Sequence, residues 1–268
     1  MTAPLRTVLF TGGHDRDGVE RALTSGADSV VIDLEEPRTP FPEPERVLAR
    51  ALVQQILSDR PMADRPLIFV RPQPWPSGGT LDDLDAVMGP NLAGILVAKV
   101  QSPGDIVAAD ALVTNIERRR GIPRGQVVLY PILETAQALR LAYEIAVASP
   151  RVAYMGGAVS RFGDIHQALG YRWTAEGEET LFLRSKVLVD ARAAGIRYPI
   201  SGMWGGAVDD VDGLRAWATS LRDLGYYGMM IGDPAHVPLV HEVFTPTADE
   251  IAYWLELDRL ATEAERDG

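Results

Sequence analysis

The chain has 268 residues, of which 46% are hydrophobic and 24% charged, a composition typical of a folded globular protein. Its formal net charge of −11 argues against a nucleic-acid-binding surface, which needs clustered basic residues, and against binding to anionic membranes. The absence of cysteine excludes disulfides, thiolate nucleophiles and cysteine-bound zinc, and is consistent with a cytoplasmic location. We find no signal-peptide pattern at the first residues and no run of about 18 apolar residues, so we predict no membrane span.

Short apolar segments alternate with amphipathic ones along the chain, which is the pattern of β/α units in a parallel sheet. We predict eight strands, at 7–11, 29–33, 66–71, 93–100, 126–133, 151–155, 196–201 and 227–231. We predict helices at 15–25, 45–57, 81–88, 103–119, 134–149, 164–194 with a break near 176–177, 210–224, 234–244 and 248–263. Eight such alternations predict one α/β domain over residues 1–268, a TIM (β/α)8 barrel with an extra C-terminal helical segment.

Charged residues follow several predicted strands at their C-terminal ends. The segment SVVIDLEEP (29–37) begins as a buried strand and ends in Asp33, Glu35 and Glu36 before a proline. Charges are costly to bury unless they are paired or bind a metal. Four more charged residues are expected at the same end of the barrel, namely Arg71, Lys99, Glu134 and Asp164. Because the active sites of TIM barrels lie at this end, the sequence predicts an active site there.

Carboxylates in a chain without cysteine suggest a hard cation with oxygen ligands. Glu134 and Asp164, from consecutive β/α loops, are the candidate ligands of Mg²⁺, with Mn²⁺ as the alternative ion. Arg71 suits bidentate binding of a carboxylate or an enolate oxygen. The acids Asp33, Glu35 and Glu36 would then orient Arg71 or water.

Each of these residues also has a structural interpretation. Glu134 could favour a helix dipole, Asp164 could cap a helix, and Arg71 with Glu35 could form an ion pair that only stabilises the barrel. Lys99 is one of only two lysines, and a Schiff base at Lys99 is a rival mechanism. We rank that mechanism lower because it leaves the carboxylates without a role.

Other polar and aromatic residues are less informative. His14 follows the Gly12-Gly13 loop at the mouth of the first strand and could act as an acid or base. The other three histidines are interpreted as structural or solvent-facing, and the five tryptophans mainly as packing or interface residues. Arg46 and Arg50, with Arg38, could meet the phosphates of coenzyme A, but pairing with neighbouring acids is the commoner fate of such residues.

The motifs resemble the citrate lyase β-subunit-like (CitE-like) branch of the HpcH/HpaI aldolase superfamily from Thr7 to about Glu250. The segments that carry the resemblance are VLFTGG (8–13), GADSVVIDLEEP (26–37), R-x-x-A-R (46–50), FVRP (69–72), AKVQSP (98–103), ILET (132–135), GD (163–164) with LG (169–170), and FTPTADEI (244–251). The resemblance implies a homo-oligomer, often a trimer or hexamer. It also implies that the C-terminal helix, about 246–265, packs on a neighbouring subunit.

The resemblance further implies Mg²⁺ on Glu134 and Asp164, with substrate held by the ion and Arg71. It implies reversible carbon–carbon cleavage or formation through an enolate, on a small carboxylate or an acyl-CoA substrate, and such an enolate would be stabilised by a cation and an arginine. We also predict substrate contacts from Lys99, His14 and the backbone amides of Gly156 and Gly157, the amides lying at a helix start.

Three segments depart from the family pattern. Residues 34–38 read LEEPR instead of LEDAV, residues 200–204 lack an aspartate followed by an aromatic, and residues 231–236 replace I-H-P-x-Q. The second and third departures alter the mouth of the barrel, so we assign neither citryl-CoA nor malyl-CoA as substrate. The alternatives are a CoA thioester hydrolase, a biosynthetic condensing enzyme and a non-catalytic ligand-binding paralogue.

Overall fold

The computed structural model describes residues 2–36, 40–61 and 66–267. Its eight parallel strands form one sheet in the order β6-β5-β4-β3-β2-β1-β8-β7. The strands are β1 (Thr7–Gly12), β2 (Ser29–Asp33), β3 (Leu67–Arg71), β4 (Gly94–Val97), β5 (Val128–Leu133), β6 (Gly156–Gly157), β7 (Ile200–Met203) and β8 (Gly228–Ile231). The two edge strands meet, because Ile200 N donates to Met155 O at 3.4 Å and Met203 N to Val159 O at 3.3 Å. The predicted TIM barrel is therefore confirmed.

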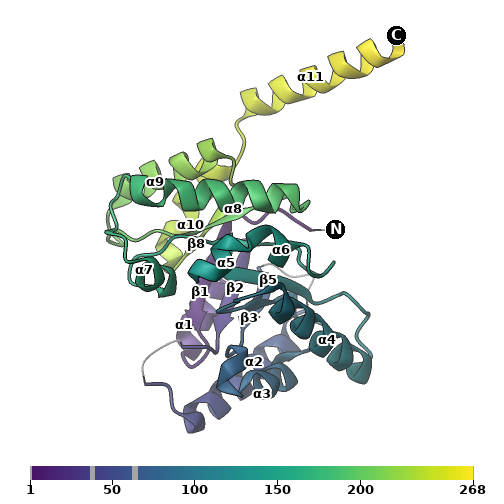
Figure 1. Cartoon of the computed structure of the whole chain (residues 1–268), viewed down its shortest axis with the longest axis vertical. Coiled ribbons are helices and arrows are strands. Elements are labelled where there is room, and N and C mark those ends of the chain that lie inside the picture. Colours follow the sequence, from purple (N-terminus) through teal and green to yellow (C-terminus); the bar gives the residue numbers. More distant parts are fainter. Residues whose placement is uncertain (1, 37–39, 62–65, 268) are drawn as a thin grey trace.

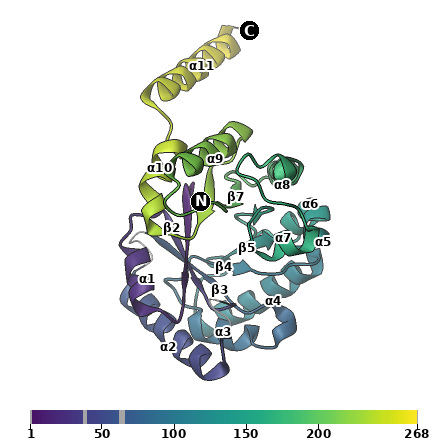
Figure 2. The ribbon, with the colours of Figure 1, turned by 90° about the vertical axis from the view of Figure 1, so that its left-hand side faces the viewer.

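The helices surround the strands, as Figure 2 shows. They are α1 (Arg16–Leu23), α2 (Glu43–Asp59), α3 (Thr80–Val87), α4 (Pro103–Arg120), α5 (Ala136–Arg140), α6 (Ala142–Ala146), α7 (Asp164–Leu169), α8 (Leu181–Ala193), α9 (Val211–Leu224), α10 (Val237–Phe244) and α11 (Ala248–Asp267). Short 3₁₀ turns lie at Trp75–Ser77, Glu178–Thr180 and Pro234–His236. Among the described residues, we find no helix long and apolar enough to cross a bilayer.

Several predicted elements differ from the structure. The helical region predicted at 164–194 with a break near 176–177 is the short helix α7 and the helix α8, and residues 170–180 between them contain only the 3₁₀ turn. The strand predicted at 151–155 is displaced, since β6 consists of Gly156–Gly157 paired with Ile132 and Leu133, after one bridge at Val152. A Cβ at Gly157 would lie 2.8 Å from the oxygen of Leu133, so glycine permits the close approach to β5. The helix predicted at 134–149 is two short helices, α5 and α6, interrupted at Leu141.

Alternation along the strands decides which side chains reach the mouth of the barrel. Val31, Phe69 and Ile132 lie in the apolar cluster that fills the barrel interior. Side chains two residues apart point to the same face of a strand. The next inward positions are therefore Asp33 on β2, Arg71 on β3 and the residue after β5, which is Glu134. Below this mouth, Phe69, Tyr130 and Tyr154 form an aromatic floor with ring centroids 5.8–6.2 Å apart.

Helix α11 extends away from the barrel at the end of a short connection (Figure 1). Its side chains are exposed, including Tyr253 at 61% and Trp254 at 66%. The predicted C-terminal helical segment is thus confirmed, and its packing on a neighbouring subunit stays a prediction.

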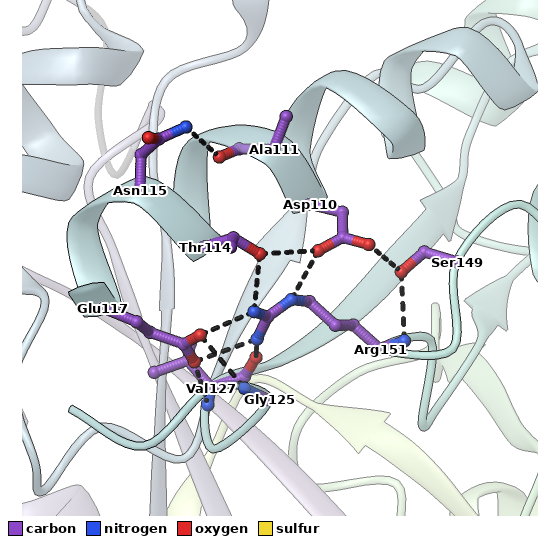
Figure 3. A network of polar contacts seen from close by, with 9 residues as sticks. All are labelled: Asp110, Ala111, Thr114, Asn115, Glu117, Gly125, Val127, Ser149 and Arg151. Carbon is purple, nitrogen blue, oxygen red and sulfur yellow. Dashed lines mark hydrogen bonds and ion pairs between the residues drawn. The ribbon is translucent and has the colours of Figure 1, made fainter.

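A buried ion-pair network lies at the opposite end of the barrel, where β5 and β6 begin (Figure 3). Arg151 donates to Asp110 Oδ1 at 2.6 Å and to both carboxylate oxygens of Glu117 at 2.5 and 2.9 Å. The carboxylate of Glu117 also accepts the backbone N–H groups of Gly125 and Val127. These bonds tie helix α4 to the start of two strands.

Candidate active site

Asp33 and Arg71 end neighbouring strands and are paired in register. Arg71 donates from Nε to Asp33 Oδ1 at 2.9 Å and from one terminal nitrogen to Oδ2 at 2.7 Å. Its other terminal nitrogen lies 3.0 Å from Glu35 Oε2. The backbone N–H of Glu35 also donates to Asp33. Asp33 and Glu35 therefore hold the guanidinium of Arg71 at the mouth.

Three carboxylates converge beside this arginine. Oxygens of Glu35, Glu134 and Asp164 all lie within 4.8 Å of one another. They come from the loop after β2, the end of β5 and the first residue of α7. The structure thus brings together the two predicted ligands and adds Glu35 as a third oxygen donor, which the sequence had assigned to orienting Arg71 or water.

Burial shapes the protonation of two of these acids. Burial, followed by the negative charge of Glu35, raises the pKa of Glu134 to about 7. Burial also raises the pKa of Glu35, although Arg71 and Lys99 oppose the rise. Among the described residues, Glu35 Oε1 has no hydrogen-bond partner of good geometry. A bound cation would stabilise the charged forms of these two carboxylates.

The acid set fits a hard divalent ion. All the candidate ligand atoms are carboxylate oxygens, which are the ligands that Mg²⁺ prefers. Among the described residues, four carboxylates of the mouth, Asp33, Glu35, Glu134 and Asp164, lie beside the two cations Arg71 and Lys99. A divalent ion would balance the excess negative charge.

Lys99 contacts all three of the converging acids. Its backbone adopts a left-handed conformation with φ of 51°, and its N–H donates to Glu134 Oε1 at 2.6 Å. Its ammonium lies 3.2 Å from Glu35 Oε1 and 3.5 Å from Asp164 Oδ2. Burial lowers the pKa of Lys99, but the nearby acids outweigh it and raise the pKa above its usual value. A Schiff-base lysine needs the opposite shift, so the geometry disfavours that rival mechanism.

Neither candidate ligand serves as a helix cap. Thr135, rather than Glu134, caps α5 by accepting from the N–H of Ala138 at 3.0 Å. Gly163 occupies the cap position of α7, which leaves Asp164 at the first helical residue. Their side chains are therefore free to serve the site.

The remaining predicted residues lie at varied positions. Glu36 is exposed, and its charge contributes to raising the pKa of Lys99. His14 is exposed, with its ring 5.7 Å from that of Phe41. Gly156 and Gly157 lie in strand β6, so the expectation that they stand at a helix start is wrong, because α7 begins only at Asp164. Substrate contacts from His14, Gly156 and Gly157 stay a prediction, as does a catalytic role for Glu36.

The arginines suggested for coenzyme A are engaged with the protein. Arg46 donates to the backbone oxygens of Leu34, Glu35 and Phe41, and so shapes the acidic turn. Arg50 pairs with Asp83 at 2.7 Å and with Glu43 at 2.6 Å. Pro37 and Arg38 lie outside the described residues.

One contact at the site was not predicted from the sequence. The guanidinium of Arg71 lies 5.4 Å from the ring centroid of Phe10, so an aromatic face supports the arginine. Alternation from Val8, which lies in the barrel interior, could have indicated that Phe10 points toward the mouth.

The fold and this site define a (β/α)8 barrel whose acidic mouth suits a divalent cation and an anionic substrate. The chain belongs to the HpcH/HpaI aldolase/citrate lyase family, whose pattern matches residues 6–234.

Relatives place it in the citrate lyase β-subunit-like branch and support a lyase-type enzyme. A citrate lyase subunit beta-like protein from Deinococcus radiodurans is 34% identical over 274 residues, covering 99% of this chain and 90% of the relative. A (3S)-malyl-CoA thioesterase from Cereibacter sphaeroides is 30% identical over 265 residues, covering 99% and 86%. The protein CitE from Mycobacterium tuberculosis, solved in complex with magnesium, acetoacetate and coenzyme A, shares the fold with a TM-score of 0.69 at 22% identity, covering 99% and 89%.

Proposed function

We propose that this protein is a Mg²⁺-dependent carbon–carbon lyase or aldolase that acts through the enolate of a 2-oxo acid or an acyl-CoA thioester. The observation that carries the proposal is the convergence of Glu35, Glu134 and Asp164 within 4.8 Å, beside an arginine fixed by Asp33. The magnesium complex of the related CitE structure supports the choice of ion.

The residues of this chain have distinct proposed roles. Glu134 and Asp164 would hold the ion, with Glu35 close enough to take part. The ion, when bound, would supply Lewis-acid stabilisation of developing negative charge on a substrate oxygen. Arg71 would bind the substrate carboxylate or enolate oxygen, and Asp33 would keep its guanidinium oriented. Cleavage of the carbon–carbon bond would leave its electron pair on the fragment that becomes the enolate, while the hydroxyl group of the other fragment would lose its proton to a base and become a carbonyl.

The test combines substitution with direct observation of the ligand. Glu134→Ala should abolish metal-dependent turnover, whereas Glu144→Gln, an exposed glutamate on α6, should leave it unchanged. A crystal soaked with Mg²⁺ and oxaloacetate or pyruvate should show the oxo acid and the ion among Glu134, Asp164 and Arg71. A fully active Glu134→Ala variant would overturn the proposal.

A thioesterase is the second candidate, because relatives about 30% identical are named (3S)-malyl-CoA thioesterases. Product analysis separates the two functions. A thioesterase releases free thiol from an acyl-CoA and leaves its carbon chain intact, whereas a lyase divides the chain. A condensing enzyme would instead join two carbon skeletons.

We also infer a homo-oligomer, a trimer or hexamer, in which α11 packs on a neighbouring subunit in the cytoplasm. The exposed apolar side chains of this helix support the inference, among them Ile251, Trp254 and Leu255. Light scattering on a chain ending at Thr247 should show a smaller assembly than the full chain. An unchanged mass would contradict the role of α11.

A further inference from the structure

We propose that Lys99 is a tethered cation, which holds the acid site together without a divalent ion and is displaced when that ion binds. The proposal rests on the proposed Mg²⁺ site and concerns what this chain's own residue does there. It would make ion binding a switch that releases an amine into the mouth of the barrel.

The position of Lys99 carries the first step. This single residue contacts all three converging acids, through its backbone N–H to Glu134 and its ammonium to Glu35 and Asp164. The contacts require a left-handed backbone, which is unfavourable for a residue with a Cβ. A left-handed backbone at a residue other than glycine persists only where the surrounding structure enforces it, commonly at functional sites.

Charge balance carries the second step. Arg71 is already committed to Asp33 and Glu35, whereas the Lys99 ammonium lies 3.5 Å from Asp164 Oδ2 and the Lys99 backbone N–H reaches Glu134. Without a cation among them, carboxylates within 4.8 Å would repel one another. Lys99 therefore supplies the charge that allows the acids to assemble.

The ion and the ammonium compete for the same carboxylates, Glu35 and Asp164. Mg²⁺ binds its ligand oxygens at about 2.0–2.1 Å, which leaves no room for an ammonium among them. The two positive charges would also repel strongly at such a separation. Binding of the ion must therefore move the Lys99 ammonium away from Glu35 and Asp164.

The displaced amine has a place to go. The side chain of Lys99 is 34% exposed, so it lies at the rim of the site on a flexible stem. Once released, its ammonium would be free to pair with an anionic group of the substrate. Ion binding would then precede productive binding of the anion.

The first measurement is calorimetric titration of the full chain with MgCl₂. Lys99→Met removes the competing charge and should bind Mg²⁺ roughly tenfold more tightly or better, since tenfold corresponds to only about 1.4 kcal/mol. Lys99→Arg keeps a competing cation and should stay near the wild-type affinity. Lys186→Met is the matched control, because Lys186 pairs with Asp190 on helix α8, away from the acids.

The second measurement follows the amine itself. Mild acetylation and mass spectrometry would compare the rates at Lys99 and Lys186 with and without Mg²⁺. The rate at Lys99 should rise severalfold on adding Mg²⁺, whereas that at Lys186 should not change. This readout separates displacement from a purely structural role and needs no substrate.

Both results are required. If wild-type protein binds Mg²⁺ and Glu134→Gln abolishes that binding, the proposed metal site holds. In that case an unchanged affinity in Lys99→Met, or an unchanged acetylation rate at Lys99, overturns the displacement alone. If neither the wild type nor Lys99→Met binds Mg²⁺, the proposed site and the displacement fail together.

Discussion

Two arginines stand at opposite ends of the barrel, each held by carboxylates, and they differ in how fully those carboxylates are bonded. At the base, both oxygens of Asp110 and both of Glu117 accept hydrogen bonds (Figure 3). At the mouth, Arg71 meets Asp33 and Glu35, but Glu35 Oε1 lacks a hydrogen bond of good geometry. The carboxylate oxygens at the base are all hydrogen-bonded, whereas Glu35 at the mouth keeps one oxygen that, among the described residues, has only the Lys99 ammonium near it.

The pKa values follow the same division. At the base, burial alone would raise the pKa of Glu117, but bonds from Arg151 and two backbone N–H groups hold it below its usual value. At the mouth, burial raises the pKa of Glu35 and Glu134. The same residue types therefore form a stabilising network in one place and the candidate active site in the other, and the number of hydrogen-bonded carboxylate oxygens distinguishes them.

The largest expected effect is on stability at the base. Glu117→Gln should lower the free energy of unfolding by about 3–5 kcal/mol, because it leaves Arg151 without its main buried counter-charge. The matched change at the mouth, Glu134→Gln, should cost far less, since it removes a charge that burial disfavours. Urea denaturation at pH 8 without divalent ions would measure both. Equal losses of unfolding free energy in Glu117→Gln and Glu134→Gln would contradict the expected difference between base and mouth.

The next effect is a pH dependence specific to the mouth. The folded state holds the proton of Glu134 more tightly than the unfolded chain, whose pKa is 4.5 against about 7 in the folded state. Stability from this group is therefore greatest below pH 4.5 and is lost as pH rises to about 7, by on the order of 3 kcal/mol. Measured without Mg²⁺, the free energy of unfolding of the wild type should fall relative to that of Glu134→Gln as the pH rises from 5 to 8. A constant difference would contradict the raised pKa.

Mg²⁺ should stabilise the protein through the mouth alone. An ion at 100 times its Kd that binds only the folded state adds about 2.7 kcal/mol to the free energy of unfolding. Asp164→Asn should lose most of this gain, whereas Asp209→Asn, an exposed aspartate before α9, should keep it. Thermal melts with and without MgCl₂ would test this. A full gain in Asp164→Asn would place the ion elsewhere.

The smallest expected effect is on stability, from loss of a hydrogen-bonding hydroxyl at the base. Ser149→Ala removes the hydrogen bond to Asp110 and the one accepted from the Arg151 backbone N–H, and should cost about 1–2 kcal/mol, with the Mg²⁺ response unchanged. Denaturation with and without MgCl₂ would check both parts. A changed Mg²⁺ response would show that the two ends of the barrel are coupled.

The parts of the fold set by local pattern could be predicted from the sequence. Strand β2 has the predicted bounds, because all five of its residues are buried and its apolar run, residues 30–32, ends directly at the first acid, Asp33. Strand β6 could not be placed, since the apolar residues before it resemble a strand while Gly156 and Gly157 resemble a loop. Only the close approach to Leu133 shows why the glycines are the paired residues.

The candidate site was predictable in its composition and less so in its bonding. Strand ends and alternation bring Asp33, Arg71 and Glu134 to one face. The convergence of Glu35 with Glu134 depends on a loop path that no periodicity describes. The left-handed backbone of Lys99 is likewise set by tertiary contacts, because a lysine has no local preference for it.

The short strand β6 has a consequence for motion at the site. It has two residues, and hydrogen bonds of 3.4 and 3.3 Å beside it join the barrel to β7. The backbone amides of this seam should therefore exchange their hydrogens sooner than those of the longer, well-paired strands β2 and β5, which Glu35 and Glu134 follow. Asp164 follows this seam in the chain, so local opening would withdraw one acid while the other two stay in place.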